Sequence, residues 1–255
     1  MTPVTVPLVA GEIERRILVN YRVDPAAVAR LLPAPFRPQT INGFAVAGIC
    51  LIRLGSMRPR PLPAWVGLRS ENAAHRIAVE WDTPGGTKTG VFIPRRDSNS
   101  RINVVVGGRL YPGEHHRAQF DVSESSTDLR VKFASGDGVT QVQVAVRLRD
   151  ELVGSELFKD TAAASAFFKA GSVGFSATRD ANRFDGLQLL TASWKVEPAE
   201  AVAVQSSFFD DPYQFPQGSA KLDCALVMRN VPVDWKPLED LQVDQQPSPP
   251  TISPS

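Results

Sequence analysis

The chain has 255 residues and a formal net charge of +1, and 43% of its residues are hydrophobic. This length suits one large all-β domain or two smaller domains, and either can bury a substantial core. The balanced charge gives no electrostatic reason to expect nucleic acid or an anionic membrane as a partner. No stretch approaches the roughly 18 apolar residues of a membrane span, and the N-terminus lacks a signal-peptide pattern. We therefore expect a cytoplasmic protein.

Neither cysteine usage nor chain organisation indicates a second module. Cys50 and Cys224 both lie within apolar runs, which is typical of buried free thiols. Residues 239–255 are polar and rich in proline and have nothing to bury, so they are predicted to form a disordered tail. Because no linker or internal repeat interrupts the rest, residues 1–238 are interpreted as one domain.

The N-terminal part predicts strands around one short helix. Residues 13–23 alternate between apolar and polar side chains, the period of a half-buried strand. Asp24-Pro25 predicts the start of a helix, as an N-cap followed by proline. Asn42-Gly43 predicts a tight hairpin, because both residues tolerate the positive φ that such a turn needs. Residues 44–54 are apolar on both faces and should form a strand in the middle of the fold.

The next predicted strand, 68–81, carries polar residues whose direction matters. The last odd-numbered residues of this strand, Ile77, Val79 and Trp81, are apolar, so the face that carries the odd-numbered residues is expected to point inward. By this alternation Glu71 and His75 point inward, whereas Arg76 points outward. A β-bulge in between would reverse the assignment.

The remaining elements complete a mainly β (α+β) pattern. Ser155–Lys169 has the spacing of a helix, with Gly171 as its C-cap. Further strands are predicted at 87–93, 118–122, 129–133, 142–146, 172–177, 187–196, 202–205 and 222–231. Adjacent short strands of this kind are typical of an antiparallel meander within a barrel or sandwich.

Two consecutive cations follow the strand that ends at Pro94. If the chain is extended there, only one of Arg95 and Arg96 faces the interior. A buried guanidinium is rarely left alone, because its desolvation is costly unless it is paired, here by Asp97 or Glu71. One interpretation is a fork that grips a substrate carboxylate at two points. The other is an exposed loop with a weak surface ion pair.

Glu71 and His75 form a second candidate set. Near apolar walls, a carboxylate and an imidazole have shifted pKa values and can move protons. The alternative is a hydrogen-bonded core histidine and a solvated glutamate. His115-His116 is better explained by a solvated turn than by a metal, because neighbours on an extended chain point in opposite directions. Common nucleotide and hydrolase motifs are missing from the sequence, and we predict neither a metal nor a cofactor.

Several segments together resemble a known family. They are LLPAPF, INGFAVAGICLIRL, SENAAHRIAVEW, TGVFIPRRDSNSRI, LLTASWKVEP and SAKLDCALVMRNV. In pattern and order, residues 16–235 are similar to the YqjF-like uncharacterised family of the acetoacetate decarboxylase-like superfamily. The resemblance implies a bent, partly closed antiparallel β-barrel with a few short helices and a buried central cavity.

The resemblance also implies that the lysine that forms a Schiff base in the decarboxylase is missing here. In the decarboxylase, a Gly-Phe-Pro-Lys-Lys segment supplies a Schiff-base lysine, which cavity Glu and Arg residues assist. Here Arg95 and Arg96 replace both lysines. A guanidinium stays charged and non-nucleophilic, so decarboxylation through an imine is not expected.

We therefore predict a protein that binds a small carboxylate- or carbonyl-bearing metabolite, with Arg95, Arg96, Glu71 and His75 as ligand-binding residues. Whether it is an enzyme stays open, as does a homo-oligomeric state. One alternative is a decarboxylase-like lyase that uses another residue. The other is a structural or oligomeric protein whose cavity is filled by side chains.

Overall fold

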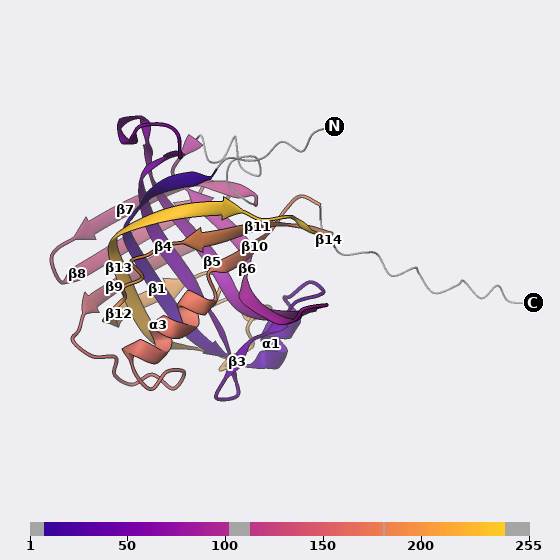
Figure 1. Cartoon of the computed structure of the whole chain (residues 1–255). Helices are drawn as coiled ribbons and strands as arrows, with labels where there is room; N and C mark the ends of the chain where they lie inside the picture. The colour runs from indigo at the N-terminus through magenta and orange to yellow at the C-terminus, as the bar shows by residue number, and fades with distance from the viewer. Residues whose placement is uncertain (1–7, 102–112, 181, 243–255) are drawn as a thin grey trace, which may run out of the picture.

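The structure, a computed structural model, describes residues 8–101, 113–180 and 182–242 (Figure 1). Its helices are α1 (Pro25–Ala29), the 3-10 helix η1 (Ala64–Val66) and α3 (Thr161–Ala170). Its strands are β1 (Val9–Val23), β2 (Arg37–Pro38), β3 (Thr40–Ile41), β4 (Phe44–Pro59), β5 (Leu68–Thr83), β6 (Gly86–Ser98), β7 (His115–Glu124), β8 (Asp128–Ser135), β9 (Gln141–Leu148), β10 (Val173–Ala177), β11 (Arg183–Leu190), β12 (Glu197–Ser206), β13 (Ala220–Pro237) and β14 (Leu241–Gln242). The predicted mainly β class is confirmed.

The strands belong to one large, bent sheet that closes on itself twice. One circuit of pairings runs through β1, β4, β5, β6, β10, β11 and β13 and returns to β1. A second circuit leaves β6 through β7, β8, β9 and β12 and rejoins at β13. Most pairs are antiparallel, as predicted, but β6 pairs in parallel with β10 and with β7. The result is a bent, partly closed β-barrel.

The strands that both circuits share are covered on both faces. β4 is predominantly buried, as its two apolar faces predict. One side of the shared strands meets an aromatic core that includes Phe92, Phe175 and Phe209. The other side meets a second core, in which Phe168 of α3 packs. In the central parts of these strands, residues on either face are therefore inside the protein.

The local signals for turns and caps are confirmed. The Asp24 carboxylate accepts a hydrogen bond of 2.9 Å from the backbone N–H of Ala26 at the start of α1. Asn42 and Gly43 have φ of 50° and 81° in the hairpin between β3 and β4. Cys50 is a buried free thiol, as is Cys224.

Some element boundaries differ from the predictions. The helix predicted from Ser155 begins at Thr161, because Asp160 caps it by accepting from the backbone N–H of Ala163 at 2.7 Å. The strand predicted over 187–196 is β11 and ends at Leu190. The predicted tail starts at residue 239, whereas the described chain continues through β14; the rest of that prediction, 243–255, lies outside the described residues. Among the described helices, none has the length and hydropathy that a bilayer crossing requires.

Candidate ligand-binding cavity

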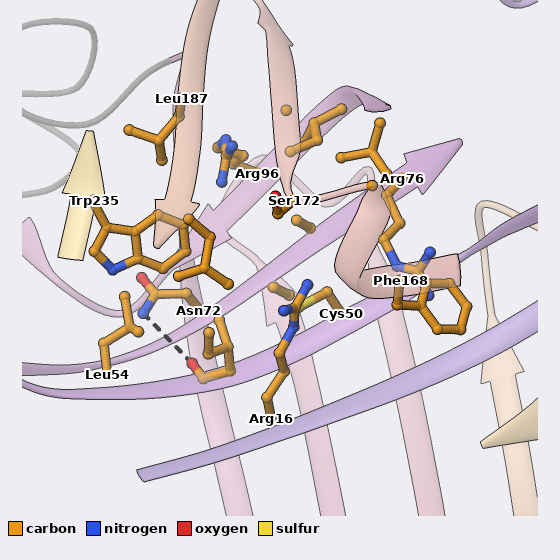
Figure 2. A pocket seen from close by; sticks show the side chains of 18 of the residues that line it. Arg16, Cys50, Leu54, Asn72, Arg76, Arg96, Phe168, Ser172, Leu187 and Trp235 are labelled. Atoms are coloured by element: carbon orange, nitrogen blue, oxygen red, sulfur yellow. Dashed lines mark hydrogen bonds between the residues drawn. The ribbon is translucent and has the colours of Figure 1, made fainter. Parts of the chain in front are cut away.

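A cavity of about 110 Å³ lies within the first strand circuit, next to the C-terminal end of α3 (Figure 2). Every strand of this circuit contributes to its wall. The wall consists of Arg16, Cys50, Ile52, Leu54, Asn72, Ala73, Ala74, Arg76, Val91, Ile93, Arg96, Asp97, His115, Phe168, Gly171, Ser172, Gly174, Leu187, Leu189, Trp194 and Trp235. It is largely apolar, with a small set of polar groups, as is typical of small-molecule sites.

Three arginines dominate the polar part of the wall. Arg16 comes from β1, Arg76 from β5 and Arg96 from β6, and Figure 2 shows their guanidinium groups at separate points around the cavity. In the described part of the chain, none of the three forms an ion pair with a carboxylate. Buried cations are normally paired, so this wall carries an uncompensated positive charge.

Arg76 is the most deeply buried of the three, with 3% of its surface exposed. It reaches across Gly48 of β4 to donate from Nη2 to the side-chain oxygen of Asn20 on β1. A Cβ at position 48 would lie 3.3 Å from Arg76 Nη2 and 2.2 Å from the carbonyl oxygen of Val19, so glycine makes room for this crossing. The Arg76 guanidinium also lies over the ring of Phe168, 4.6 Å from its centroid. Burial lowers the pKa of Arg76 to about 10.

Arg16 and Arg96 have weak or neutral partners. Arg16 donates from Nε to the sulfur of Cys50 at 3.1 Å and from Nη1 to the sulfur of Met228 at 4.0 Å, and both are poor acceptors. Arg96 donates from Nε to the hydroxyl of Ser176 at 2.9 Å. The pKa of Arg96 is lowered to about 10, chiefly by burial and in smaller part by the positive charge of Arg16. Both guanidinium groups keep donors for a ligand.

Hydrogen-bond donors without acceptors concentrate at the cavity. Seven buried side-chain atoms in the described part of the chain lack a hydrogen-bond partner, and four of them belong to the cavity wall. These four are Nε and Nη1 of Arg76 and the indole nitrogens of Trp194 and Trp235. All four are donors, and a buried donor without a partner costs about 1–3 kcal/mol. A ligand rich in acceptor oxygens would satisfy them.

A β-bulge decides which of the two consecutive arginines faces the cavity. In the β5–β6 ladder, Ile77 pairs with Phe92 and His75 with Arg95, so two residues of β6 oppose the single residue between them on β5. One of the two is Pro94, which has no N–H to give to the ladder. The bulge shifts the alternation by one residue. As a result Arg96 lines the cavity, and Arg95 lies on the opposite face.

Arg95 is neutralised by two carboxylates. It donates from Nη2 to Asp97 at 3.0 Å and to Asp137 at 2.8 Å. Burial opposes its charge, but the hydrogen bonds to these two carboxylates raise the pKa of Arg95. Asp97 itself is buried, and this burial raises its pKa in spite of Arg95. Arg95 is thus already paired in the absence of a ligand.

Glu71 lies away from the cavity, in a partly buried ion cluster. It accepts from Arg15 at 2.6 Å and from Nε of Arg53. Glu124 on β7 also pairs with both arginines, at 2.9 Å from Arg53. The two positive and two negative charges bridge β1, β4, β5 and β7. We define Arg15, Arg53, Glu71 and Glu124 as the ion cluster.

His75 is fully buried on the same side of β5 as Glu71. Its ring lies 4.5 Å from the ring of Phe208, and Nε2 is 3.5 Å from the hydroxyl oxygen of Ser206. Burial lowers the pKa of His75 to about 3, and the charge of Arg95 acts in the same direction. Of the four predicted ligand-binding residues, the structure therefore brings one, Arg96, to the cavity.

Sequence reasoning missed several residues of the wall. Arg76 was expected to point outward, but the outer face of β5 is covered by α3 and the neighbouring strands, so it points into the cavity. His115 was expected in a solvated turn. It is instead the first residue of β7, pairs with Arg96 of β6 and lines the cavity. The pKa of His115 is lowered to about 3, chiefly by burial and in smaller part by the positive charge of Arg96. One sequence signal could have found Arg16 and Arg76. Each is a charged residue in the middle of a strand that pairs with β4, the strand that is apolar on both faces.

Several solved structures share this fold. An acetoacetate decarboxylase from Legionella pneumophila has a TM-score of 0.59 at 10% sequence identity, covering 92% of this chain and 88% of that one. An acetoacetate decarboxylase-like enzyme from Sphingomonas wittichii RW1 has a TM-score of 0.59 at 14% identity, covering 94% and 98%. The enduracididine biosynthesis enzyme MppR, complexed with pyruvate, has a TM-score of 0.60 at 11% identity, covering 94% and 91%. The protein therefore has the acetoacetate decarboxylase-like fold, as the resemblance implied.

The family follows from the sequence match. Residues 11–230 match the model of DUF2071, described as an uncharacterized conserved protein, and the chain belongs to this family. The comparison with curated protein sequences gives no match.

Proposed function

We propose that this protein binds a small carboxylate- or carbonyl-bearing metabolite in the three-arginine cavity, without forming a Schiff base. The observation that carries the proposal is the surplus of donors: three guanidinium groups without carboxylate partners among the described residues, and four buried N–H groups without acceptors. Carboxylate and carbonyl oxygens are acceptors, and a carboxylate also compensates charge.

The size of the cavity limits the ligand. Its volume is about 110 Å³, and a single water needs about 10–15 Å³ on this measure, so there is room for roughly ten non-hydrogen atoms. This size suits a metabolite with a few carbon atoms. It also weighs against the alternative that side chains fill the cavity.

The relatives support the ligand class. The fold neighbour MppR was captured with pyruvate, a small keto acid. The described wall of this cavity contains no lysine, so the residues that surround a bound carbonyl offer no amine for an imine. With a keto acid and borohydride, we expect no covalent adduct in the intact mass. An adduct on any lysine would favour the lyase alternative.

Isothermal titration calorimetry with pyruvate, on wild type, Arg96→Gln and Arg95→Gln, tests the proposal. Arg96→Gln should weaken binding at least tenfold, because it removes a charge-assisted contact. Arg95→Gln should weaken it less, because Arg95 lies on the opposite face and acts on the cavity only through its partner Asp97. Arg69→Gln, which removes an exposed arginine outside the cavity, controls for the loss of a cation. Weakened binding in Arg95→Gln alone would instead place the ligand on the face of Glu71 and His75.

Roles of Arg95, Glu71 and His75 in binding stay predictions, and the variants above address the first of them. Cytoplasmic localisation and homo-oligomerisation also stay predictions.

A further inference from the structure

The charge of the cavity exceeds what a single carboxylate can compensate. Arg16 lies close enough to both Arg76 and Arg96 that its charge contributes to lowering both of their pKa values. Asp185 is an acid that acts on Arg96 in the opposite direction. However, Asp185 already accepts from the backbone N–H of Gly113 at 2.9 Å and lies 3.6 Å from Arg183. A monoanion would therefore leave positive charge buried in the wall.

The three guanidinium groups also do not converge on one point. Figure 2 shows Arg96 on one side of the cavity, Arg76 beside Phe168 on another, and Arg16 on a third. Arg96 is anchored on Ser176 of β10, whereas Arg76 is anchored on Asn20 of β1. Both anchors hold the arginine by one nitrogen, so the other donors of each guanidinium keep a fixed direction.

We propose that the ligand is a small dicarboxylate, bound with one carboxylate at Arg96 and the other at Arg76, with Arg16 between the two ends. This inference rests on the proposed function and specifies its substrate class. Two carboxylates compensate two of the three charges and supply four acceptor oxygens for the unpartnered donors. Succinate, with eight non-hydrogen atoms, falls within the roughly ten that the cavity admits.

The separation of the arginines distinguishes a dicarboxylate from another dianion of the same charge. A phosphate or sulfate carries its charge on oxygens around a single central atom and is best bound where several donors converge. The cavity instead has donors on separate walls with apolar side chains between them, such as Ile93, Leu187 and Leu189. A short aliphatic linker between two carboxylates matches that arrangement.

The test compares four ligands by isothermal titration calorimetry: succinate, butyrate with the same four carbons and one carboxylate, monomethyl succinate with one carboxylate blocked, and inorganic phosphate. For the wild type we expect succinate to bind at least tenfold more tightly than butyrate or monomethyl succinate, and phosphate to bind more weakly than succinate. Equal Kd values for succinate and butyrate, both weakened by Arg96→Gln, would overturn the dicarboxylate but leave the proposed function intact. Tighter binding of phosphate would also overturn it. No heat with any of these anions or with pyruvate would contradict the proposed function itself.

Variants at the two ends sharpen the result. Arg76→Gln should bring succinate down to the affinity of butyrate while leaving butyrate within about twofold, because one end of the ligand loses its partner. Arg16→Gln provides a second variant in case Arg76→Gln does not fold, since Arg16 is held by two sulfur atoms among the described residues. It should lower the preference for succinate over butyrate at least threefold. An unchanged preference in every folded variant would overturn the proposed placement. Arg69→Gln is the matched control in all titrations.

Discussion

The ion cluster and the cavity both contain buried arginines, but only those of the ion cluster are paired with carboxylates among the described residues. In the ion cluster, Arg15 and Arg53 face Glu71 and Glu124, and the charges cancel. In the cavity, three arginines lack carboxylate partners among the described residues, and Asp97 of the same wall pairs with Arg95. The two sites are separated by the thickness of the shared strands, because neighbours along a strand point to opposite faces. Arg15 belongs to the cluster and Arg16 to the cavity.

The same division recurs along the shared strands. His75 and Arg76 are split between the two sides, and so are Arg95 and Arg96. On the side of the ion cluster, each charged group has a partner of opposite charge. On the cavity side they do not. A paired buried arginine is thus expected to serve stability, and an unpaired one to serve binding.

The largest effect should come from breaking the ion cluster. Glu71→Gln removes the carboxylate that Arg15 and Arg53 share and leaves an excess of buried positive charge. We expect the free energy of unfolding to fall by about 3–5 kcal/mol, measured by urea denaturation. A loss below 1 kcal/mol would show that Glu124 and solvent compensate the arginines, and the contrast between the two regions would fail.

The pH dependence of stability tests the buried histidine on the cluster side. The pKa of His75 is lowered from 6.5 to about 3 in the folded protein, so below pH 6.5 the unfolded chain binds a proton that the folded chain does not. Its contribution to stability is complete above pH 6.5 and is lost as the pH falls toward 3, by about 1.4 kcal/mol per pH unit. The His75→Phe variant keeps a ring against Phe208. Between pH 7 and 4.5, its free energy of unfolding should fall by about 2–3 kcal/mol less than that of the wild type. If the free energy of unfolding has the same pH dependence in both proteins, His75 takes up a proton as readily in the folded as in the unfolded chain.

Removing an unpaired charge should cost little stability. Arg76→Met deletes a cation without a carboxylate partner among the described residues and keeps the stem that packs near Phe168. It also leaves Asn20 without its donor, so the two effects offset each other. We expect the free energy of unfolding to stay within about 1 kcal/mol of wild type, while succinate binding falls at least tenfold. A loss comparable to that of Glu71→Gln would assign Arg76 to stability.

The smallest effect is expected at the surface. Arg69 pairs with Glu14 at 2.6 Å but is 64% exposed. Exposed pairs of this kind contribute about 0–1 kcal/mol and are screened by salt. Arg69→Gln should therefore unfold in urea at nearly the wild-type midpoint, with any difference disappearing at high salt. A large shift would disqualify it as the control for the other variants.

Local signals in the sequence determined the elements of this fold. The two-residue alternation of β1, the Asp24 cap and the Asn42-Gly43 hairpin depend on residues next to each other, so they could be predicted. The two apolar faces of β4 likewise indicated a central strand. The consecutive Arg95 and Arg96 are also a property of the sequence, and the family resemblance led us to expect anion binding there rather than covalent catalysis.

The tertiary structure decided where each charge lies. The bulge at Pro94 places Arg96 rather than Arg95 in the cavity, and it is defined only by the pairing of β5 with β6. The closure of the first circuit under α3 turns the face of β5 that was expected to meet solvent into a cavity wall, which brings Arg76 inside. Both results depend on contacts between residues far apart in the chain, whereas alternation reports only that two faces exist and not what covers them.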